Sequence, residues 1–409
     1  MNTATAQGSG AWSPFQQRDF ALLWTAALLS NTGSWMHETA AGWLMTTLAP
    51  TPFMVAMVQA ATTLPVFLLA LPAGALADRA DRRRLLLLVQ GYMLVLAGVL
   101  GALVLAHAAS TAWLLAITFG LGIGTAITVP TWQAILPQLV PRANLPPAVA
   151  LHAVGINLSR AIGPAVGGLL IVALGIAWPF FINALSFLAI IVALWLWRPA
   201  AASTPAPVTE SLFASIRTGL AHAPGNRMLR NTLLRSAAFY LFGSAYWALL
   251  PLIARQQLRG DARLFGILVG CIGAGAVAGA LWLPRLRARA GLDGTLLAGT
   301  IGTALAMAGY ALLQVPVLGM LTSLLAGAAW IAALSSLNVA AQLAVPDWIR
   351  ARGMALYSAV FYGCLAAGSM AWGQIANRIG LTPVLLIAAA GAMLMLPLAR
   401  PLPIHVQPR

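Results

Sequence analysis

The sequence predicts an all-α membrane protein with twelve transmembrane helices in two pseudo-symmetric six-helix bundles. Three observations support this: a near absence of charge, a series of long apolar runs, and an internal repeat. Hydrophobic residues make up 60% of the 409 residues and charged residues 8%, and the mean hydropathy is +0.87. Typical soluble domains carry about 25% charged residues. Because so few charges cannot cover a surface that faces water, most of this surface must face lipid.

A helix that crosses the bilayer needs about 20 mostly apolar residues. Twelve runs satisfy this requirement: 20–46, 53–77, 85–107, 111–136, 146–171, 176–197, 229–254, 262–284, 291–314, 316–341, 351–376 and 381–399. Segment 199–227 begins with Ala, Ser, Thr and Pro, which is typical of a flexible linker. Within it, 210–222 fits a short amphipathic helix on the membrane surface. We therefore expect bundles over 1–198 and 228–409, with a cytoplasmic linker over 199–227.

Parts of the two halves align without gaps when the chain is shifted by 205 residues. Gly-Ala-Leu at 74–76 then falls on Gly-Ala-Leu at 279–281, and each triplet precedes an Arg cluster. A second stretch, 141–175, repeats several Pro, Ala, Leu and Gly positions in 346–380 in the same register. A parallel repeat of six spans is the plan of secondary transporters, whose substrate sites lie midway between the halves.

All 23 basic residues are Arg, and they give a net charge of +15. They lie in short clusters between apolar runs and not along one face, so we expect no nucleic-acid partner. With both termini in the cytoplasm, seventeen Arg fall in cytoplasmic segments and four outside, as the positive-inside rule requires. This predicts a multi-pass protein of the bacterial inner membrane. The loop from Arg255 to Arg263 is the one clear violation, and Asp261 offsets it only partly.

Several kinds of chemistry are excluded by what the chain lacks. A Walker A loop needs a Lys, and this chain has none, so if it pumps a substrate it must draw on an ion gradient or a separate ATPase. Cys271 and Cys364 both fall inside apolar runs, and the five His residues show no metal-ligand spacing. No nucleophile or acid pair stands at a useful spacing either. We therefore expect no enzyme activity, no cofactor and no metal.

The second and third spans are joined by 74–84, Gly-Ala-Leu-Ala-Asp-Arg-Ala-Asp-Arg-Arg-Arg. This segment resembles motif A of the major facilitator superfamily, although the family usually has Gly where Asp81 stands. The resemblance implies that Asp78 docks near the start of the eleventh span, around 347–350, and latches the cytoplasmic side. The alternative is a solvated loop that only sets topology. The latch interpretation assigns a cytoplasmic gate to Gly74, which would let helices approach closely, and to Asp78, Arg79, Arg82 and Arg83.

The fifth span contains Gly-Pro-Ala-Val-Gly-Gly at 163–168. It resembles the core of motif C, which is found in exporters of the superfamily. Proline removes one backbone hydrogen bond, and glycines permit close helix packing. The alternative is generic packing of small residues. The motif assigns a packing role to Gly163, Pro164, Gly167 and Gly168.

Two charges lie well within predicted spans, where an unpaired charge costs several kcal/mol. Glu38 is the one acid well within a span, and Arg160 lies near the middle of the fifth span at a similar depth. Our hypothesis is that they communicate across the cavity or pair directly, and that Glu38 carries a proton. The alternatives are a structural salt bridge, or Glu38 reaching the outer interface. Thr118 stands where many drug/proton antiporters of the superfamily have a buried Arg, so Arg160 is the remaining candidate.

Polar and aromatic residues within spans are candidates for an amphipathic substrate cavity, although any one of them can equally be a packing residue. They are Trp35, His37, Gln59, Gln133, Asn157, Tyr240, Trp247, Asn338, Gln342, Tyr357 and Tyr362.

The whole chain resembles the enterobactin-exporter-like branch of the superfamily, the transmembrane secretion effectors. The phrases that carry this are Ser-Asn-Thr-Gly-Ser-Trp-Met at 30–36 and Asn-x-Ser-Arg-x-x-Gly-Pro at 157–164. The resemblance implies an ion-coupled, most simply proton-coupled, exporter of a siderophore, drug or other secondary metabolite that works by alternating access. A nutrient symporter or a lysolipid flippase is the alternative. The expected partners are a small molecule, protons or another coupling ion, and membrane lipids, and we expect a monomer.

Overall fold

The computed structural model describes residues 10–197, 226–345, 350–399 and 402–404, and no strand occurs among them. The N-terminal half consists of α1 (Arg18–Leu48), α2 (Pro52–Arg79), α3 (Arg82–Leu105), α4 (Thr111–Ile135), α5 (Leu145–Leu174) and α6 (Trp178–Leu196). The C-terminal half consists of α8 (Arg227–Leu252), α9 (Ala262–Leu312), α10 (Pro316–Leu343), α11 (Arg350–Ile379) and α12 (Leu381–Ala399). A π-helical turn, η4 (Ile253–Gln257), follows α8.

Helix α9 is two transmembrane spans that meet at Gly291. This glycine has φ 65° and ψ −172°, a backbone conformation that other residues rarely adopt, and it reverses the chain direction. Counted as two, α9 completes the twelve predicted spans. The prediction ended the eighth span at 284, but the helix continues to 290, and a single glycine takes the place of the expected loop. Nine of the described helices, with α9 counted once, are long and apolar enough to cross a membrane.

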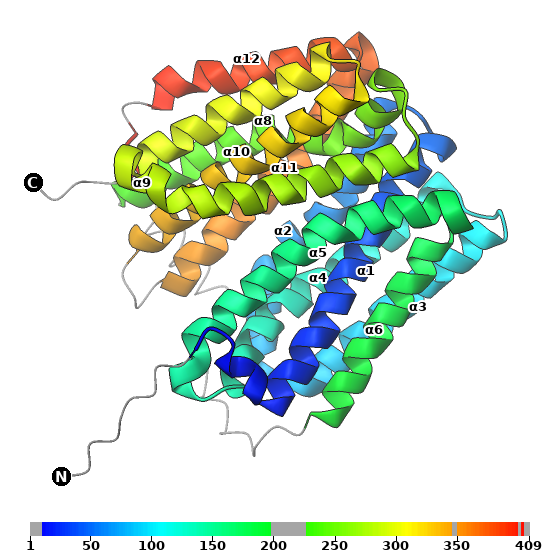
Figure 1. The fold of residues 1–409 in the computed structure, drawn as a ribbon, viewed down its shortest axis with the longest axis vertical. Helices are drawn as coiled ribbons and strands as arrows, with labels where there is room; N and C mark the ends of the chain where they lie inside the picture. The colour runs from blue at the N-terminus through cyan, green and yellow to red at the C-terminus, as the bar shows by residue number, and fades with distance from the viewer. Residues whose placement is uncertain (1–9, 198–225, 346–349, 400–401, 405–409) are drawn as a thin grey trace, which may run out of the picture.

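The two halves lie side by side as separate bundles, and the start of α1 and the end of α12 lie at the same end of the molecule (Figure 1). We call this the terminal end and the opposite one the distal end. Large apolar side chains cover outward faces of both bundles: Leu88 is 73% exposed, Trp195 74% and Leu281 70%. A surface this apolar is disfavoured in water and favoured in hydrocarbon.

The internal repeat is visible in the helix packing. A Cβ added at Gly163 would lie 2.8 Å from a carbonyl oxygen of α1, and one at Gly368 would lie 2.8 Å from a carbonyl oxygen of α8. One turn further on, a Cβ at Gly168 would lie 2.5 Å from the backbone of α9, and one at Gly373 would lie 2.5 Å from a side-chain atom of α2. Equivalent glycines, 205 residues apart, therefore make equivalent contacts: first within a half, then between halves.

The halves touch at the distal end and diverge toward the terminal end (Figure 1). Their contact is formed by α5 against the first span of α9, and by α2 against α11. At the first contact Gly168 and Gly266 bring the two backbones together, and at the second Gly363 packs on Phe67. Because glycine and alanine allow this close approach, the distal end is closed by dense backbone packing.

Two sequence-based expectations fall on other parts of the chain. The amphipathic helix over 210–222 lies outside the described residues. So do residues 347–349 of the stretch 347–350 at which Asp78 is expected to dock, and the Asp78 side chain itself.

Candidate functional site

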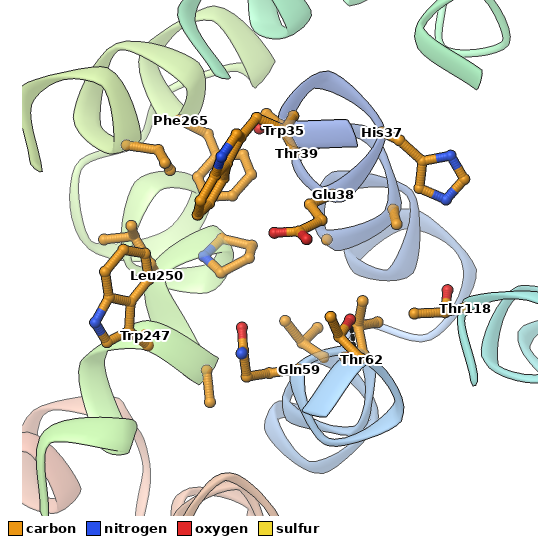
Figure 2. Close-up of a pocket in the computed structure, with 17 residues that line it drawn as sticks. Trp35, His37, Glu38, Thr39, Gln59, Thr62, Thr118, Trp247, Leu250 and Phe265 are labelled. Carbon is orange, nitrogen blue, oxygen red and sulfur yellow. Dashed lines mark hydrogen bonds between the residues drawn. The ribbon is translucent and has the colours of Figure 1, made fainter. Parts of the chain in front are cut away.

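A cavity of about 70 Å³ lies between the halves, where α1 and α2 face α8 and the first span of α9 (Figure 2). The carboxylate of Glu38 points into it, toward Gln59 and Trp247. The other lining residues are mostly apolar or weakly polar: Trp35, His37, Thr39, Ala41, Gly42, Val55, Val58, Thr62, Thr118, Ala248, Leu250, Pro251, Phe265 and Val269. The site is therefore one carboxylate within an aromatic and aliphatic wall that both halves supply.

Glu38 lies twenty residues after Arg18, about 30 Å along α1 and about 15 Å before its end at Leu48. It therefore sits far from both ends of α1, and its exposed side chain faces the space between the halves. Among the described residues, Glu38 accepts no hydrogen bond and forms no ion pair. A carboxylate in this position keeps all its acceptor capacity for water, a proton or a ligand.

Arg160 projects from α5 with its guanidinium carbon 5.1 Å from the centre of the Trp35 ring, a cation–π contact. Its Nε is buried and has no hydrogen-bond partner. Arg160 and Glu38 interact electrostatically, but no N···O distance between them is as short as 4.0 Å. The structural salt bridge weighed above is thus not formed in this arrangement, because Arg160 packs against the Trp35 ring.

The aromatic wall of the cavity is held rigidly by the C-terminal half. Trp247 lines the cavity, and its indole N–H is buried without a partner. Behind it, Tyr246 lies 5.5 Å from Trp247 and 6.1 Å from Tyr310, and Trp330 meets Trp247 edge-on at 5.7 Å between ring centres. Such interlocked rings fix the orientation of the wall.

His37 belongs to a different environment from Glu38, although the two are neighbours in sequence. Its ring lies on the side of α1 away from Glu38 (Figure 2), in edge-to-face contact with Phe180 at 4.8 Å. Both ring nitrogens and the Thr118 hydroxyl are buried without partners. His37 thus touches the cavity lining, but its ring is packed inside the N-terminal half.

Seven predicted cavity residues do not line this cavity. The Tyr240 and Tyr357 hydroxyls bond to each other at 2.7 Å inside the C-terminal half, so these residues are packing and not cavity residues. The side chains of Asn338 and Gln342 bond to each other within α10. The Asn157 side chain bonds within its own helix, α5, and Gln133 is exposed on α4. Tyr362 is also absent from the lining but interacts electrostatically with Arg160 and Glu38.

The motif A segment is tied to its own half. Arg83 donates to the carbonyls of Leu194 and Trp195 at 2.7 and 2.9 Å, which caps the end of α6, and Arg82 donates to α4 at 3.2 Å. Asp81, the departure from the family pattern, caps α3 by accepting from a backbone N–H at 2.9 Å. Arg79 is exposed. A Cβ at Gly74 would meet no described atom within 4 Å, so the close helix approach expected there is absent in this arrangement.

The motif C residues lie where α5 is held between α1 and α9. Gly163 and Gly167 face α1, where a Cβ at Gly167 would lie 2.9 Å from the Cα of Met36. Gly168 and the carbonyl of Pro164 face α9 and therefore belong to the contact between halves. The same short segment thus positions the helix of Arg160 against the helix of Glu38 and closes the distal end.

Sequence reasoning missed the cavity residues that carry no polar signal. Phe265 stacks on Trp43 at 6.2 Å between ring centres, and Leu250, Pro251 and Val269 complete the wall. All four lie in apolar runs where the cavity face and the lipid face have the same composition. The one sequence feature that could have indicated these cavity residues was the Gly-rich stretch that follows Phe265 in α9.

Twelve helices in two repeated halves, with a cavity between the halves, define a secondary transporter of the major facilitator superfamily. Residues 9–406 match the family described as transmembrane secretion effector, and the chain belongs to this family. It is therefore a multi-pass membrane transporter and not an enzyme.

Characterised relatives transport siderophores. The enterobactin exporter EntS of Shigella boydii is 31% identical over 334 residues, which cover 79% of this chain and 76% of the exporter. The staphyloferrin A transporter of Staphylococcus aureus is 26% identical over 264 residues, 64% of this chain. That match spans 66% of the transporter, slightly less than two thirds of its length.

Solved structures share the fold at low sequence identity. A mutant of the nucleoside transporter NupG has a TM-score of 0.78 at 13% identity and covers 94% of this chain and 99% of its own. A bacterial homologue of the lysosomal transporter Spinster, in an inward-facing and occupied conformation, has a TM-score of 0.74 at 14% identity. It covers 97% of this chain and 99% of its own. These likenesses establish the fold alone.

Proposed function

We propose that this protein is a proton-coupled exporter of a small amphipathic molecule of the siderophore class in a bacterial inner membrane. The observation that carries the proposal is the unpaired carboxylate of Glu38 in a cavity between two halves that are closed at one end only. The named cargoes of the two relatives support the substrate class. A drug or another secondary metabolite of similar polarity would fit the same cavity.

The terminal end faces the cytoplasm in this proposal, because the Arg clusters lie there and the positive-inside rule then holds. The distal end is then periplasmic and closed, so the structure represents an inward-facing state. A cavity of about 70 Å³ is much smaller than the roughly 300–1,000 Å³ of typical ligand pockets. The cavity must therefore widen before a siderophore-sized cargo can bind beside Glu38.

Exchange of a proton for cargo requires that the two compete for one site. A carboxylate with no protein partner accepts hydrogen bonds from hydroxyl or amine groups of a cargo, and a proton removes that acceptor and its charge. Arg160, at longer range behind Trp35, stabilises the charged form of Glu38 when no proton is bound. Protonation from the periplasm would thus release cargo, and loss of the proton to the cytoplasm would restore the site.

The test measures the accumulation of cargo in inverted membrane vesicles under an imposed pH gradient, with enterobactin and staphyloferrin A as the first probes. Glu38→Gln should reduce gradient-driven accumulation at least tenfold. Asp19→Asn is the matched control, because it removes an acid from the start of the same helix. If Glu38→Gln accumulates cargo as fast as the unmodified protein, Glu38 is not the proton site.

Transport direction is decided by comparing the same vesicles in two orientations. Accumulation in inverted vesicles supports export, whereas accumulation only in right-side-out vesicles would replace it with uptake.

In the outward-facing state we propose that motif A closes the cytoplasmic side through Asp78. Asp78→Asn should then slow transport without changing Glu38-dependent coupling.

A further inference from the structure

Arg255 lies in the π-helical turn η4 of the C-terminal half and reaches across to α1 of the N-terminal half. Its Nη1 donates to the carbonyl oxygen of Thr46 at 2.6 Å and to the Thr46 hydroxyl at 2.8 Å. The guanidinium carbon also lies 5.7 Å from the centre of the Trp43 ring, a cation–π contact. One side chain thus makes three contacts with the distal end of the opposite half.

These are the two hydrogen bonds that join the halves among the described residues. The rest of the described distal contact is packing of small and apolar groups, as at Gly168 against α9 and Trp43 against Phe265. The substitution of a single polar side chain leaves packing contacts of this kind largely unchanged. Arg255 is therefore the polar element of the distal closure, and its removal leaves the helix packing of both halves in place.

The chemistry of the α1 end explains why an Arg binds there. Helix α1 ends at Leu48, so the carbonyl of Thr46 is among the last four, which have no partner within the helix. That end also carries the negative pole of the helix dipole, which favours a cation. The Thr46 hydroxyl donates its own hydrogen to the Trp43 carbonyl at 2.7 Å, which leaves its lone pairs free to accept from Arg255. A planar guanidinium can satisfy these acceptors while it lies over the Trp43 ring.

We propose that Arg255 is the outer latch of the transport cycle, a positioning residue that stabilises the inward-facing state by holding α1 against η4. The proposal rests on the proposed function for its orientation. An outward-facing state must separate these two elements, so the three contacts exist in one state only and bias the ratio of the two states. This also gives a reason for an Arg in the loop that violates the positive-inside rule.

The experiment measures the ratio of states directly, without cargo. Both native cysteines are replaced, spin labels are placed at Ala108 and Gln314, and the protein is reconstituted in lipid nanodiscs. These two exposed residues lie in distal loops of opposite halves, so their separation reports opening. Arg255→Gln should raise the population with the long distance about tenfold relative to the unmodified protein, which corresponds to about 1.4 kcal/mol.

Two matched controls come from the same segments. Arg259→Gln removes an equal charge from the same loop and should leave the ratio unchanged, since Arg259 makes no hydrogen bond or ion pair with the described residues. Thr46→Val should give part of the Arg255→Gln effect, whereas Thr47→Val should give none, because the Thr47 hydroxyl bonds within its own helix at 2.7 Å. Equal ratios for Arg255→Gln and Arg259→Gln would overturn the latch.

The outcome separates this inference from the proposed function. If Arg255→Gln shifts the ratio and no siderophore is transported by any variant, the latch stands and the cargo assignment fails. If cargo moves normally and no variant shifts the ratio, the latch fails and the function stands. Should Arg255→Gln fail to fold, Thr46→Val and Arg255→Lys answer the same question, with Lys keeping the charge but losing the planar contact with Trp43.

Discussion

Replacing Gly266 with Ala should drive the two halves apart at the distal end. Gly266 lies in the first span of α9, directly against α5. A Cβ added there would overlap the carbonyl oxygen of Pro164 and would lie 3.0 Å from the Cα of Gly168. Both are backbone atoms of a packed helix, so no flexible side chain can move aside. Only a shift of one half relative to the other relieves the overlap.

The magnitude follows from comparing the two states of the cycle. Carbon atoms prefer separations of about 3.5 Å or more, so the helices must move by a large part of an ångström. Overpacking of this kind costs about 1–3 kcal/mol. Ala also favours a helix over Gly by about 0.8–1 kcal/mol, but that gain is equal in both states and cancels from their ratio. The inward-facing state should therefore lose a factor of about 5–150 relative to the outward-facing one.

The assay is the spin-label distance across the distal end, supported by gradient-driven transport. A graded series tests the geometry: Gly270→Ala should have a smaller effect, since its Cβ would lie 3.1 Å from the nearest atom of α5. Gly91→Ala, with no described atom within 4 Å of the new Cβ, measures the helix-propensity gain alone. If Gly266→Ala keeps the distance distribution of Gly91→Ala, the glycine contact does not close the distal end.

Two further predictions concern the stability of the C-terminal half. Tyr240→Phe and Tyr357→Phe should each lower the free energy of unfolding by about 1–3 kcal/mol, because each leaves the other hydroxyl buried and unpaired. The double variant should lose less than the sum in detergent unfolding experiments, and strict additivity would show that the bond contributes nothing. Asp293→Asn should remove the ion pair with Arg235 and weaken the bond from the Ile404 N–H that holds the chain end. Because Asp293 is 40% exposed, we expect the free energy of unfolding to fall by only about 1–2 kcal/mol. An unchanged free energy of unfolding, together with unchanged proteolysis at 402–404, would contradict this prediction.

The positions of the spans and the depth of the buried charges followed from sequence, because hydropathy is a local property that adds up along the chain. Twelve apolar runs located the helices to within a few residues, and the 205-residue shift correctly paired Gly163 with Gly368. The prediction of a similar depth for Glu38 and Arg160 needed only the helical rise of about 1.5 Å per residue. The Arg clusters gave an orientation that remains a prediction.

Which face of each helix meets which neighbour was decided by tertiary structure alone. Tyr240 and Tyr357 looked like cavity residues but bond to each other across 117 positions, and His37 turns away from the cavity that Glu38 enters. Arg255 looked like a topological error and instead caps α1 from the other half. The physical reason is that lipid and protein core are equally apolar, so a membrane helix carries little amphipathic pattern to mark its inner face. Contacts between helices that are far apart in the chain can therefore be read only from the tertiary structure, in which backbones approach closely and buried polar groups pair.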